Sequence, residues 1–229
     1  MSCRLAPAAA PAIDVARAAC VEVWLLRTPA WRSRLSALLR HVDAAQRRRC
    51  NSLRVARQRD DRLLAQALHR VVLAGALDQA PGEVPLYRAA SGQPRLALPG
   101  LYTSLSHADG VIAIALSRGG PVGVDVEMPD RPSLRPIADL VCAPGEDIGD
   151  DETLLRHWVC KEAALKAAGT GLAQPMNAFR LAGRDALQLR DALGDRVAMQ
   201  VHLYGDMREC IAAVAGPVGA RPAWRWLEP

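Results

Sequence analysis

Two short stretches of the sequence gather charged side chains that could serve metal and phosphate chemistry. The first, HWVCKEAALKAAGTGL at 157–172, places Lys161, Glu162 and Lys166 close together before two glycines. On a helix, Glu162 and Lys166 lie one turn apart on the same face. That spacing fits a surface ion pair worth about 0.3–0.5 kcal/mol, and it also fits a site that needs both charges. The choice between them depends on a second feature elsewhere in the chain.

The second stretch, PVGVDVE at 121–127, supplies such a feature. In a strand, Asp125 and Glu127 share one face while the valines share the other. Two neighbouring carboxylates repel each other, which the end of a strand tolerates in water and a bound cation tolerates better. Hard oxygen ligands with room for water suit Mg²⁺, which often takes one or two carboxylates plus substrate phosphates. Together with the charges at 161–166, the pattern indicates a candidate Mg²⁺–pyrophosphate site.

A serine and a histidine stand at the end of a third segment, TSLSHADG at 103–110. His107 fits an ordinary capped surface histidine. Beside a polyphosphate it would donate two hydrogen bonds when protonated. The segment alone does not decide between these two interpretations.

The elements that must position these residues follow from hydrophobic periodicity and turn residues. The pattern predicts strands at 20–27, 101–107, 110–117, 120–127, 196–205 and 207–216, with SGQPRL at 91–96 as a turn. It predicts helices at 31–42, 43–53, 54–77, 134–140 and 151–168. Strands in adjacent hairpins with helices outside them indicate an α+β protein with antiparallel sheets. Similar proportions in two halves hint at an internal duplication, so we expect a flexible tail at 1–19 and α+β halves at 20–119 and 120–229.

Composition limits the partners without choosing one. The chain has 229 residues, 50% of them hydrophobic, and a net charge of +5. This favours a polyanionic partner: nucleic acid, an anionic membrane, an acidic protein or a phosphate-rich ligand. No apolar run approaches the ~18 residues of a membrane span. Six scattered cysteines without a C-x-x-C pair predict reduced thiols in a cytoplasmic protein, not a disulfide framework or a zinc site.

The stretches above resemble, in order along the chain, the Sfp-type 4′-phosphopantetheinyl transferases. The matching segments are GVDVE at 123–127, WVCKEAALKAAGTGL at 158–172, SLSH at 104–107 and, more loosely, GQP at 92–94 and RLLAQALHRVVLAGAL at 62–77. The string W-x-x-K-E-x-x-x-K-x-x-G-x-G-L is the specific one, whereas D-x-E alone is weak.

The resemblance implies an enzyme and a fold. Such enzymes move phosphopantetheine from coenzyme A, as co-substrate, to a serine of an acyl or peptidyl carrier protein, and adenosine 3′,5′-bisphosphate leaves. It implies two similar α+β halves related by a pseudo-twofold axis, with antiparallel sheets, flanking helices and the site between them. The implied partners are an acidic carrier protein and coenzyme A, not nucleic acid or a membrane, and a monomer suffices.

By position, the resemblance also assigns the metal and the charged groups around it. Asp125, Glu127 and Glu162 would hold Mg²⁺. Lys166 would neutralise the pyrophosphate, and Lys161 would lie alongside it. Glu162 would accept the proton of the carrier serine, either directly or through a water molecule held by the metal.

The resemblance assigns the residues that contact coenzyme A less completely than the metal ligands. Ser106 and His107 would touch the phosphates, and the basic stretch Arg47–Arg49, including Arg49, would lie with Arg62 near the adenosine end. Where the family often has lysine in its G-K-P segment, this chain has Gln93, so that contact is weaker or moved to Arg95.

Two other functions stay open at this level. Arginines between 47 and 62, with the basic charge, could form a nucleic-acid-binding module, although Asp60 and Asp61 interrupt them and no aromatic residues interleave for stacking. The chain could also bind coenzyme A without catalysis. The intact D-x-E and K-E-x-x-x-K strings argue against that second alternative.

Overall fold

The computed structural model describes residues 20–181, 187–190, 196–205 and 209–229, so the expected tail at 1–19 lies outside the described residues. The first half of the described chain contains these elements in order: β1 (Cys20–Arg27), α1 (Thr28–Trp31), η1 (Arg32–Arg34), α2 (Leu35–Leu38), η2 (Leu39–His41), α3 (Ala44–Asn51), α4 (Ala56–Leu77), β2 (Leu86–Arg88), β3 (Pro94–Leu96), β4 (Tyr102–Ala108) and β5 (Val111–Ser117).

The second half begins with the strand that carries the paired carboxylates. Its elements are, in order, β6 (Gly123–Glu127), η3 (Arg135–Ile137), α5 (Ala138–Val141), α6 (Asp151–Ala168), η4 (Gly171–Ala173), η5 (Met176–Ala178), β7 (Leu187–Arg190), β8 (Arg196–Tyr204), β9 (Ile211–Gly216) and β10 (Arg221–Trp226). Predicted strands and helices at 20–27, 54–77, 110–117 and 151–168 are confirmed to within two residues at each end.

The strands form two four-stranded sheets, ordered β10-β1-β5-β4 and β6-β9-β8-β7, and a β2–β3 hairpin. The α+β class is confirmed, and the antiparallel prediction holds except where β10 pairs with β1 in parallel. β10 also differs from the expected division at residue 120, because this last strand of the chain lies in the sheet of the first half. The sequence pattern missed it, since RPAWRW neither alternates clearly nor lies near β1 in the chain.

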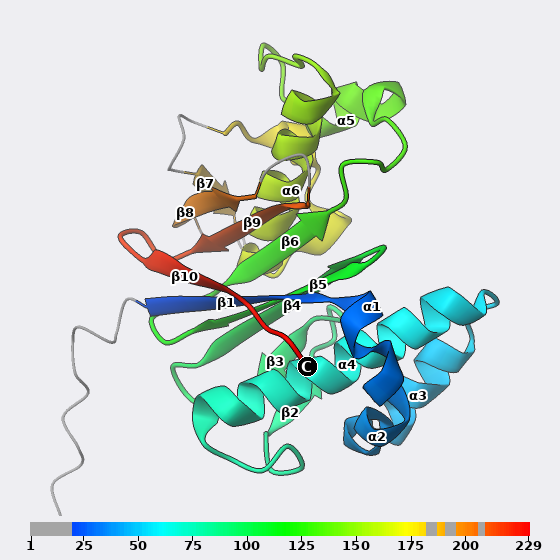
Figure 1. The fold of residues 1–229 in the computed structure, drawn as a ribbon. Helices are drawn as coiled ribbons and strands as arrows, with labels where there is room; N and C mark the ends of the chain where they lie inside the picture. Colours follow the sequence, from blue (N-terminus) through cyan, green and yellow to red (C-terminus); the bar gives the residue numbers. More distant parts are fainter. Residues whose placement is uncertain (1–19, 182–186, 191–195, 206–208) are drawn as a thin grey trace, which may run out of the picture.

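The two sheets pack face to face, and a long helix covers the outer face of each. Alternation along β1 explains the arrangement: Val21, Val23 and Leu25 face a core shared with β6 and β9, whereas Trp24 and Leu26 face α4. In Figure 1 the cyan helix α4 runs below the first sheet, and α6 lies beside β6 and β9. Each sheet is therefore buried on both faces near its centre.

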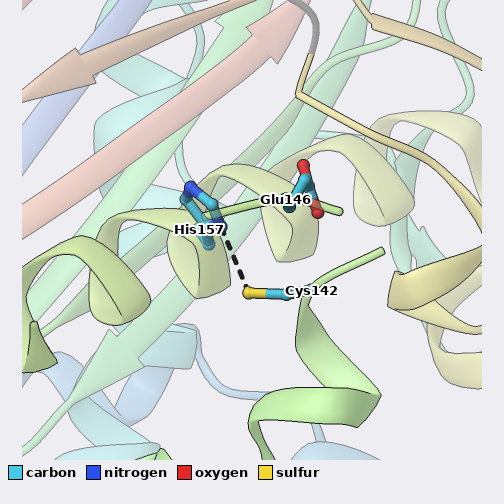
Figure 2. A group of neighbouring side chains, drawn as sticks. All are labelled: Cys142, Glu146 and His157. Atoms are coloured by element: carbon cyan, nitrogen blue, oxygen red, sulfur yellow. Dashed lines mark hydrogen bonds between the residues drawn. The ribbon is translucent and has the colours of Figure 1, made fainter. Parts of the chain in front are cut away.

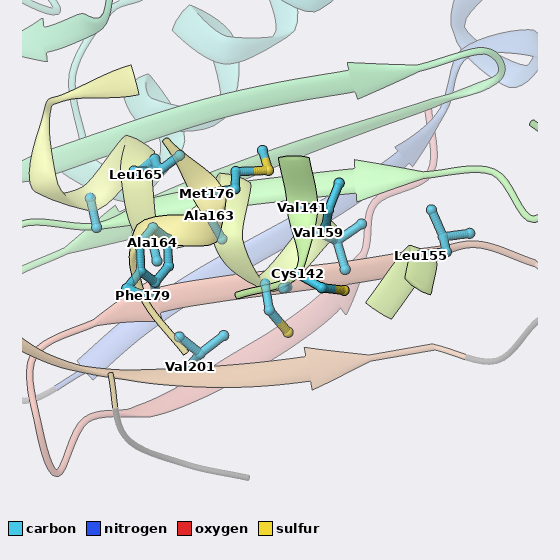
Figure 3. Packing of buried hydrophobic residues seen from close by; sticks show 14 of the residues in the cluster. Val141, Cys142, Leu155, Val159, Ala163, Ala164, Leu165, Met176, Phe179 and Val201 are labelled. Atoms are coloured by element: carbon cyan, nitrogen blue, oxygen red, sulfur yellow. The ribbon is translucent and has the colours of Figure 1, made fainter. Parts of the chain in front are cut away.

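Helix α6 packs against the second sheet through one continuous apolar core. Figure 3 shows Val159, Leu165 and Phe179 of this cluster gathered with Val201 of β8. This core fixes the rotation of α6 about its axis. The rotation decides which of its charged residues face β6.

The N-terminal helical region differs from the expected single helix at 31–42. Helical turns start earlier, at Thr28, and alternate between α and 3₁₀ geometry up to His41. Pro29 at the first turn favours this early start because its φ angle already suits a helix. No helix in the described part of the chain combines the length and apolar character needed to cross a membrane.

Candidate active site

Helix α6 is defined at both ends by local sequence. Asp150 caps its first turn by accepting a hydrogen bond from the backbone N–H of Thr153 at 2.8 Å. Gly169 ends it in the left-handed conformation, with φ of 78°. Between these ends, Trp158, Glu162 and Lys166 recur at i, i+4 spacing and form one stripe. The caps set the length of the helix so that this stripe reaches its last turn.

Strand β6 approaches α6 closely because Gly123 has no side chain. A Cβ atom at Gly123 would lie 2.0 Å from the carbonyl oxygen of Ala163 and 2.4 Å from the backbone nitrogen of Ala167. Residues 125 and 127 of β6 point to the same face as Gly123, so this contact directs both carboxylates toward the helix. Glycine at 123 is thus required by the close backbone approach.

Lys166 meets β6 and β4 at one point. Its ammonium donates hydrogen bonds to Asp125 Oδ1 at 2.6 Å, to Ser106 Oγ at 2.9 Å and to the carbonyl of Val124 at 3.1 Å. Ser106 in turn donates to Asp125 Oδ1 at 2.7 Å. The three donors of the ammonium are all used, so the lysine is held in a single position. Asp125, Ser106 and Lys166, far apart in the sequence, are therefore in direct contact.

The other two predicted metal ligands lie within electrostatic reach of Asp125. Burial and the Asp125 charge raise the pKa of Glu127 to about 7, although Arg131 and a hydrogen bond from Trp158 oppose the shift. Burial and Asp125 likewise raise the pKa of Glu162 above its ordinary value. Asp125 thus disfavours ionisation of both Glu127 and Glu162, and the three carboxyl groups form an acidic cluster.

This site fits a hard divalent cation in its chemistry. Asp125 Oδ2 is buried and has no hydrogen-bond partner among the described residues. All the candidate ligand atoms are carboxylate oxygens, which Mg²⁺ prefers. An ion that keeps several water ligands can bind carboxylates that lie some distance apart. The oxygens of Asp125, Glu127 and Glu162 are spaced in this way. In the described part of the chain, the group whose three ligand atoms lie within 4.8 Å of one another is a different one, Cys142, Glu146 and His157.

A cavity of about 360 Å³ opens beside Lys166 and Ser106. Its wall carries four basic side chains and one acidic one, with His107 and polar groups between them: Arg49, Arg62, Arg88, Lys166 and Asp43. The predicted contacts Arg49, Arg62, Ser106 and His107 all line it. A basic concave surface that ends at an acidic cluster suits a polyphosphate bound together with a cation.

The surroundings of His107 disfavour its protonated form. Burial lowers its pKa, and the nearby Arg62 guanidinium lowers it further. Arg62 Nε donates to His107 Nε2 at 3.4 Å, so that ring nitrogen accepts. That a protonated His107 donates two hydrogen bonds beside a polyphosphate stays a prediction.

Lys161 does not reach this site, which corrects its expected place beside the pyrophosphate. Its side chain is fully buried and forms an ion pair with Glu146 Oε2 at 2.5 Å. It also donates to the carbonyls of Val141, Met176 and Phe179. Adjacent helical residues point about 100° apart, so Lys161 faces the interior while Glu162 faces β6.

The basic stretch at 47–49 divides in a similar way. Arg47 donates to the carbonyls of Val42 and Leu39 and supports its own loop. Arg48 is exposed and is not among the residues lining the cavity, whereas Arg49 lines it. Further along, Arg57 and Arg32 both pair with Asp61. Several of these arginines are therefore engaged in contacts within the described part of the chain.

Two arginines near the site, Arg88 and Arg131, were not predicted from the sequence, and Gln93 has a contact that was not expected. Arg88 of β2 lines the cavity. Arg131 pairs with Glu127 at 2.5 Å and lies over the ring of Trp158. Gln93 donates to the carbonyl of Lys166 at 3.1 Å, which ties the β2–β3 hairpin to the last turn of α6. The G-Q-P string was the available signal for the hairpin, but no local pattern marks the two arginines.

Comparison with known proteins identifies the same part of the chain. A family model described as the 4′-phosphopantetheinyl transferase superfamily matches residues 121–211, which include β6 and α6. The 4′-phosphopantetheinyl transferase HetI of Nostoc sp. is 28% identical over 172 residues, covering 67% of this chain and 70% of that protein. A phosphopantetheinyl transferase of Thraustochytrium sp. is 27% identical over 248 residues, covering 91% and 85%. A 4′-phosphopantetheinyl transferase of Bacillus subtilis is 28% identical over 153 residues, covering 63% and 67%.

Proposed function

The chain belongs to the 4′-phosphopantetheinyl transferase superfamily, and from that premise we propose that it converts apo carrier proteins to their holo forms. It transfers 4′-phosphopantetheine from coenzyme A to a serine of an acyl or peptidyl carrier protein, releasing adenosine 3′,5′-bisphosphate, as an Sfp-type member. One observation supports this most strongly. The contact between Lys166 and Asp125 joins a basic cavity to a cluster of three carboxylates.

The cluster would hold the metal. Asp125, Glu127 and Glu162 supply hard oxygen ligands, and the unpartnered Asp125 Oδ2 supports this assignment. When bound, Mg²⁺ would offset the negative charge of the pyrophosphate and of the departing bisphosphate. Arg131 already offsets part of the charge on Glu127 at 2.5 Å, so it competes with a cation for that carboxylate.

The cavity would hold the nucleotide end of coenzyme A. Arg49, Arg62 and Arg88 provide positive charge along its wall, and His107 gains a proton more easily once an anion is beside it. Lys166 lies at the junction of the cavity and the carboxylates, where the pyrophosphate must sit to contact both. Its ammonium would stabilise the charge that develops on the phosphoryl oxygens.

Glu162 is the candidate acceptor for the proton of the carrier serine. An ordinary glutamate is a weak base near neutral pH, but burial and Asp125 raise the pKa of Glu162. A carboxylate with a raised pKa accepts a proton more readily, whether directly or through water. Phosphoryl transfer through a loose transition state needs little help from a base early in the reaction, so positioning by Lys166 contributes more.

The proposal also includes the kind of carrier protein that this chain modifies. With a net charge of +5, the chain is suited to an acidic partner helix. A monomer acting in the cytoplasm remains our prediction for the working form. The alternative of a coenzyme A-binding protein without catalysis makes the same cavity prediction but expects no transfer.

The test is intact-mass analysis of several apo carrier proteins after incubation with the full chain, coenzyme A and Mg²⁺, with and without chelator. We expect the carrier mass to rise by one phosphopantetheine group and the change to vanish with chelator. Coenzyme A binding without a mass change on any carrier would favour the non-catalytic alternative. A mass change that persists with chelator would remove the metal from the proposal.

A further inference from the structure

A second group of metal-ligating side chains lies on the other side of α6, away from Lys166. Cys142 follows α5, Glu146 lies in the turn between α5 and α6, and His157 lies on α6 itself. One ligand atom from each lies within 4.8 Å of the others. Figure 2 shows Cys142 and His157 facing each other along the dashed line, with Glu146 beside them. Neither the transfer reaction nor the carboxylate cluster uses any of them.

The sulfur and the imidazole already face each other. Cys142 Sγ lies 3.3 Å from His157 Nδ1, within hydrogen-bond distance for a thiol. An ion bonded to sulfur at ~2.3 Å and to nitrogen at ~2.0–2.1 Å would see these two atoms at an angle of about 100°, close to tetrahedral. Replacing the thiol proton by a metal ion therefore needs little movement of either side chain.

Glu146 has capacity for one more partner. Its Oε2 accepts from Lys161 Nζ and from the backbone N–H of Ala143, and its Oε1 accepts from the backbone N–H of Leu181. A carboxylate offers about four acceptor positions, so one remains open on Oε1. These three hydrogen bonds also fix the carboxylate in place, and metal ligands are commonly oriented by hydrogen bonds of this kind.

The charges around the group allow a dication despite the Lys161 ammonium. A cysteine thiolate and Glu146 would each contribute one negative charge, and the carboxylate of Asp147 acts electrostatically on both Cys142 and His157. With the lysine included, these charges sum to −2 and balance a divalent ion.

We propose that Cys142, Glu146 and His157 form a binding site for a borderline-soft divalent transition metal such as Zn²⁺, with water in the fourth position. One sulfur, one nitrogen and one oxygen ligand suit Zn²⁺ and do not suit Mg²⁺. On binding, the thiol loses its proton to solvent and the sulfur bonds to the ion. The site would link the 142–146 segment to α6, the helix that carries Glu162 and Lys166, without taking part in the transfer reaction.

Cobalt is the probe of choice, since thiolate-to-Co²⁺ charge transfer reports bonding to sulfur. The full chain is purified with chelator, exchanged into chelator-free buffer and titrated with Co²⁺. We expect one equivalent to produce the charge-transfer band and Zn²⁺ to displace it. Cys142→Ser should abolish the band, and His157→Ala, which removes a direct ligand, should weaken Co²⁺ affinity by more than the about 10–100-fold typical for loss of an outer-shell partner.

Two variants serve as controls. Cys160→Ala removes a buried thiol on the same helix but outside the group, and it should keep the band. Asp125→Ala removes a candidate Mg²⁺ ligand and should also keep it, which separates this site from the proposed active site. Thermal unfolding provides a second readout: Zn²⁺ should raise the melting temperature of the wild type but not of Cys142→Ser.

The proposal is overturned by a wild-type titration without a thiolate band, or by a band of equal strength in Cys142→Ser. It is also overturned if His157→Ala binds Co²⁺ as tightly as the wild type. In each of those cases the group is a hydrogen-bonded contact between the loop and the helix and nothing more.

Discussion

Lys166 Nζ donates to Asp125 Oδ1 at 2.6 Å, joining residues 41 positions apart in the chain. The contact uses only part of the hydrogen-bonding capacity of the Asp125 carboxylate. Asp125 keeps a buried oxygen without a partner among the described residues, and burial together with the Asp125 charge raises the pKa of Glu127 and Glu162. The pair thus marks the boundary between the anionic cluster and the basic cavity, and it is the natural place to test the proposed chemistry.

Asp125→Ala should abolish transfer while the protein stays folded. The substitution removes the ligand that faces both other carboxylates and one acceptor of Lys166, but Lys166 keeps Ser106 and the carbonyl of Val124. Carrier mass analysis measures activity, and circular dichroism with a thermal melt measures the fold. Asp130→Ala, at an exposed acidic residue just beyond β6, is the matched control and should remain active. Mg²⁺-dependent transfer by the Asp125 variant would count heavily against the metal assignment.

Lys166→Ala should lower kcat by about 10²–10³-fold, because it removes a preorganised charge from the developing phosphoryl charge. Initial rates at saturating coenzyme A and carrier protein isolate this effect from binding. Arg48→Ala removes one positive charge near the same cavity without lining it, and its kcat should stay near the wild-type value. A Lys166→Ala enzyme with an unchanged rate would leave the lysine only a structural role.

Lys161→Ala should destabilise the protein by about 3–5 kcal/mol. The substitution leaves Glu146, whose side chain is only 7% exposed, without the cation that compensates its charge. Glu152→Ala breaks the half-exposed pair with Arg156 and should cost at most about 0.5 kcal/mol. Urea unfolding of both variants measures the difference. Equal free energies of unfolding would mean that Lys161 contributes nothing beyond a surface ion pair.

Stability should fall as the pH drops below 6.5 because of His69. Burial, aided by Arg70, lowers the pKa of this histidine from 6.5 to about 3, so the folded protein keeps it neutral while the unfolded chain binds a proton. The stabilising effect is complete above pH 6.5 and is lost as the pH falls toward 3. Between pH 6.5 and 4.5 the loss amounts to about 2–3 kcal/mol.

The measurement is the free energy of unfolding across that pH range, in the wild type and in His69→Gln. Glutamine cannot take up the proton, so the slope should flatten in the variant. His41→Gln, at a partly exposed histidine, is the comparison and should leave most of the slope in place. A His69 variant with the wild-type slope would assign the acid sensitivity to other groups.

Local sequence was enough to predict much of this molecule. The alternation in PVGVDVE and the capped, glycine-terminated helix at 151–168 depend on near neighbours, so periodicity located β6 and α6. The same patterns put Asp125 and Glu127 on one face. They also put Glu162 and Lys166 on one stripe, so a shared site was a reasonable hypothesis from residue spacing alone.

What sequence determined by itself was therefore which residues share a face of one element. Which of those faces meet was decided only by tertiary packing. Lys161 and Glu162 are neighbours in the chain, yet the apolar core beneath α6 turns the first inward to Glu146 and leaves the second facing β6. The parallel pairing of β10 with β1 and the approach of Cys142 to His157 arise in the same way. A helix or strand fixes only the relative directions of its own side chains, and burial of its apolar face selects the one orientation that brings distant residues together.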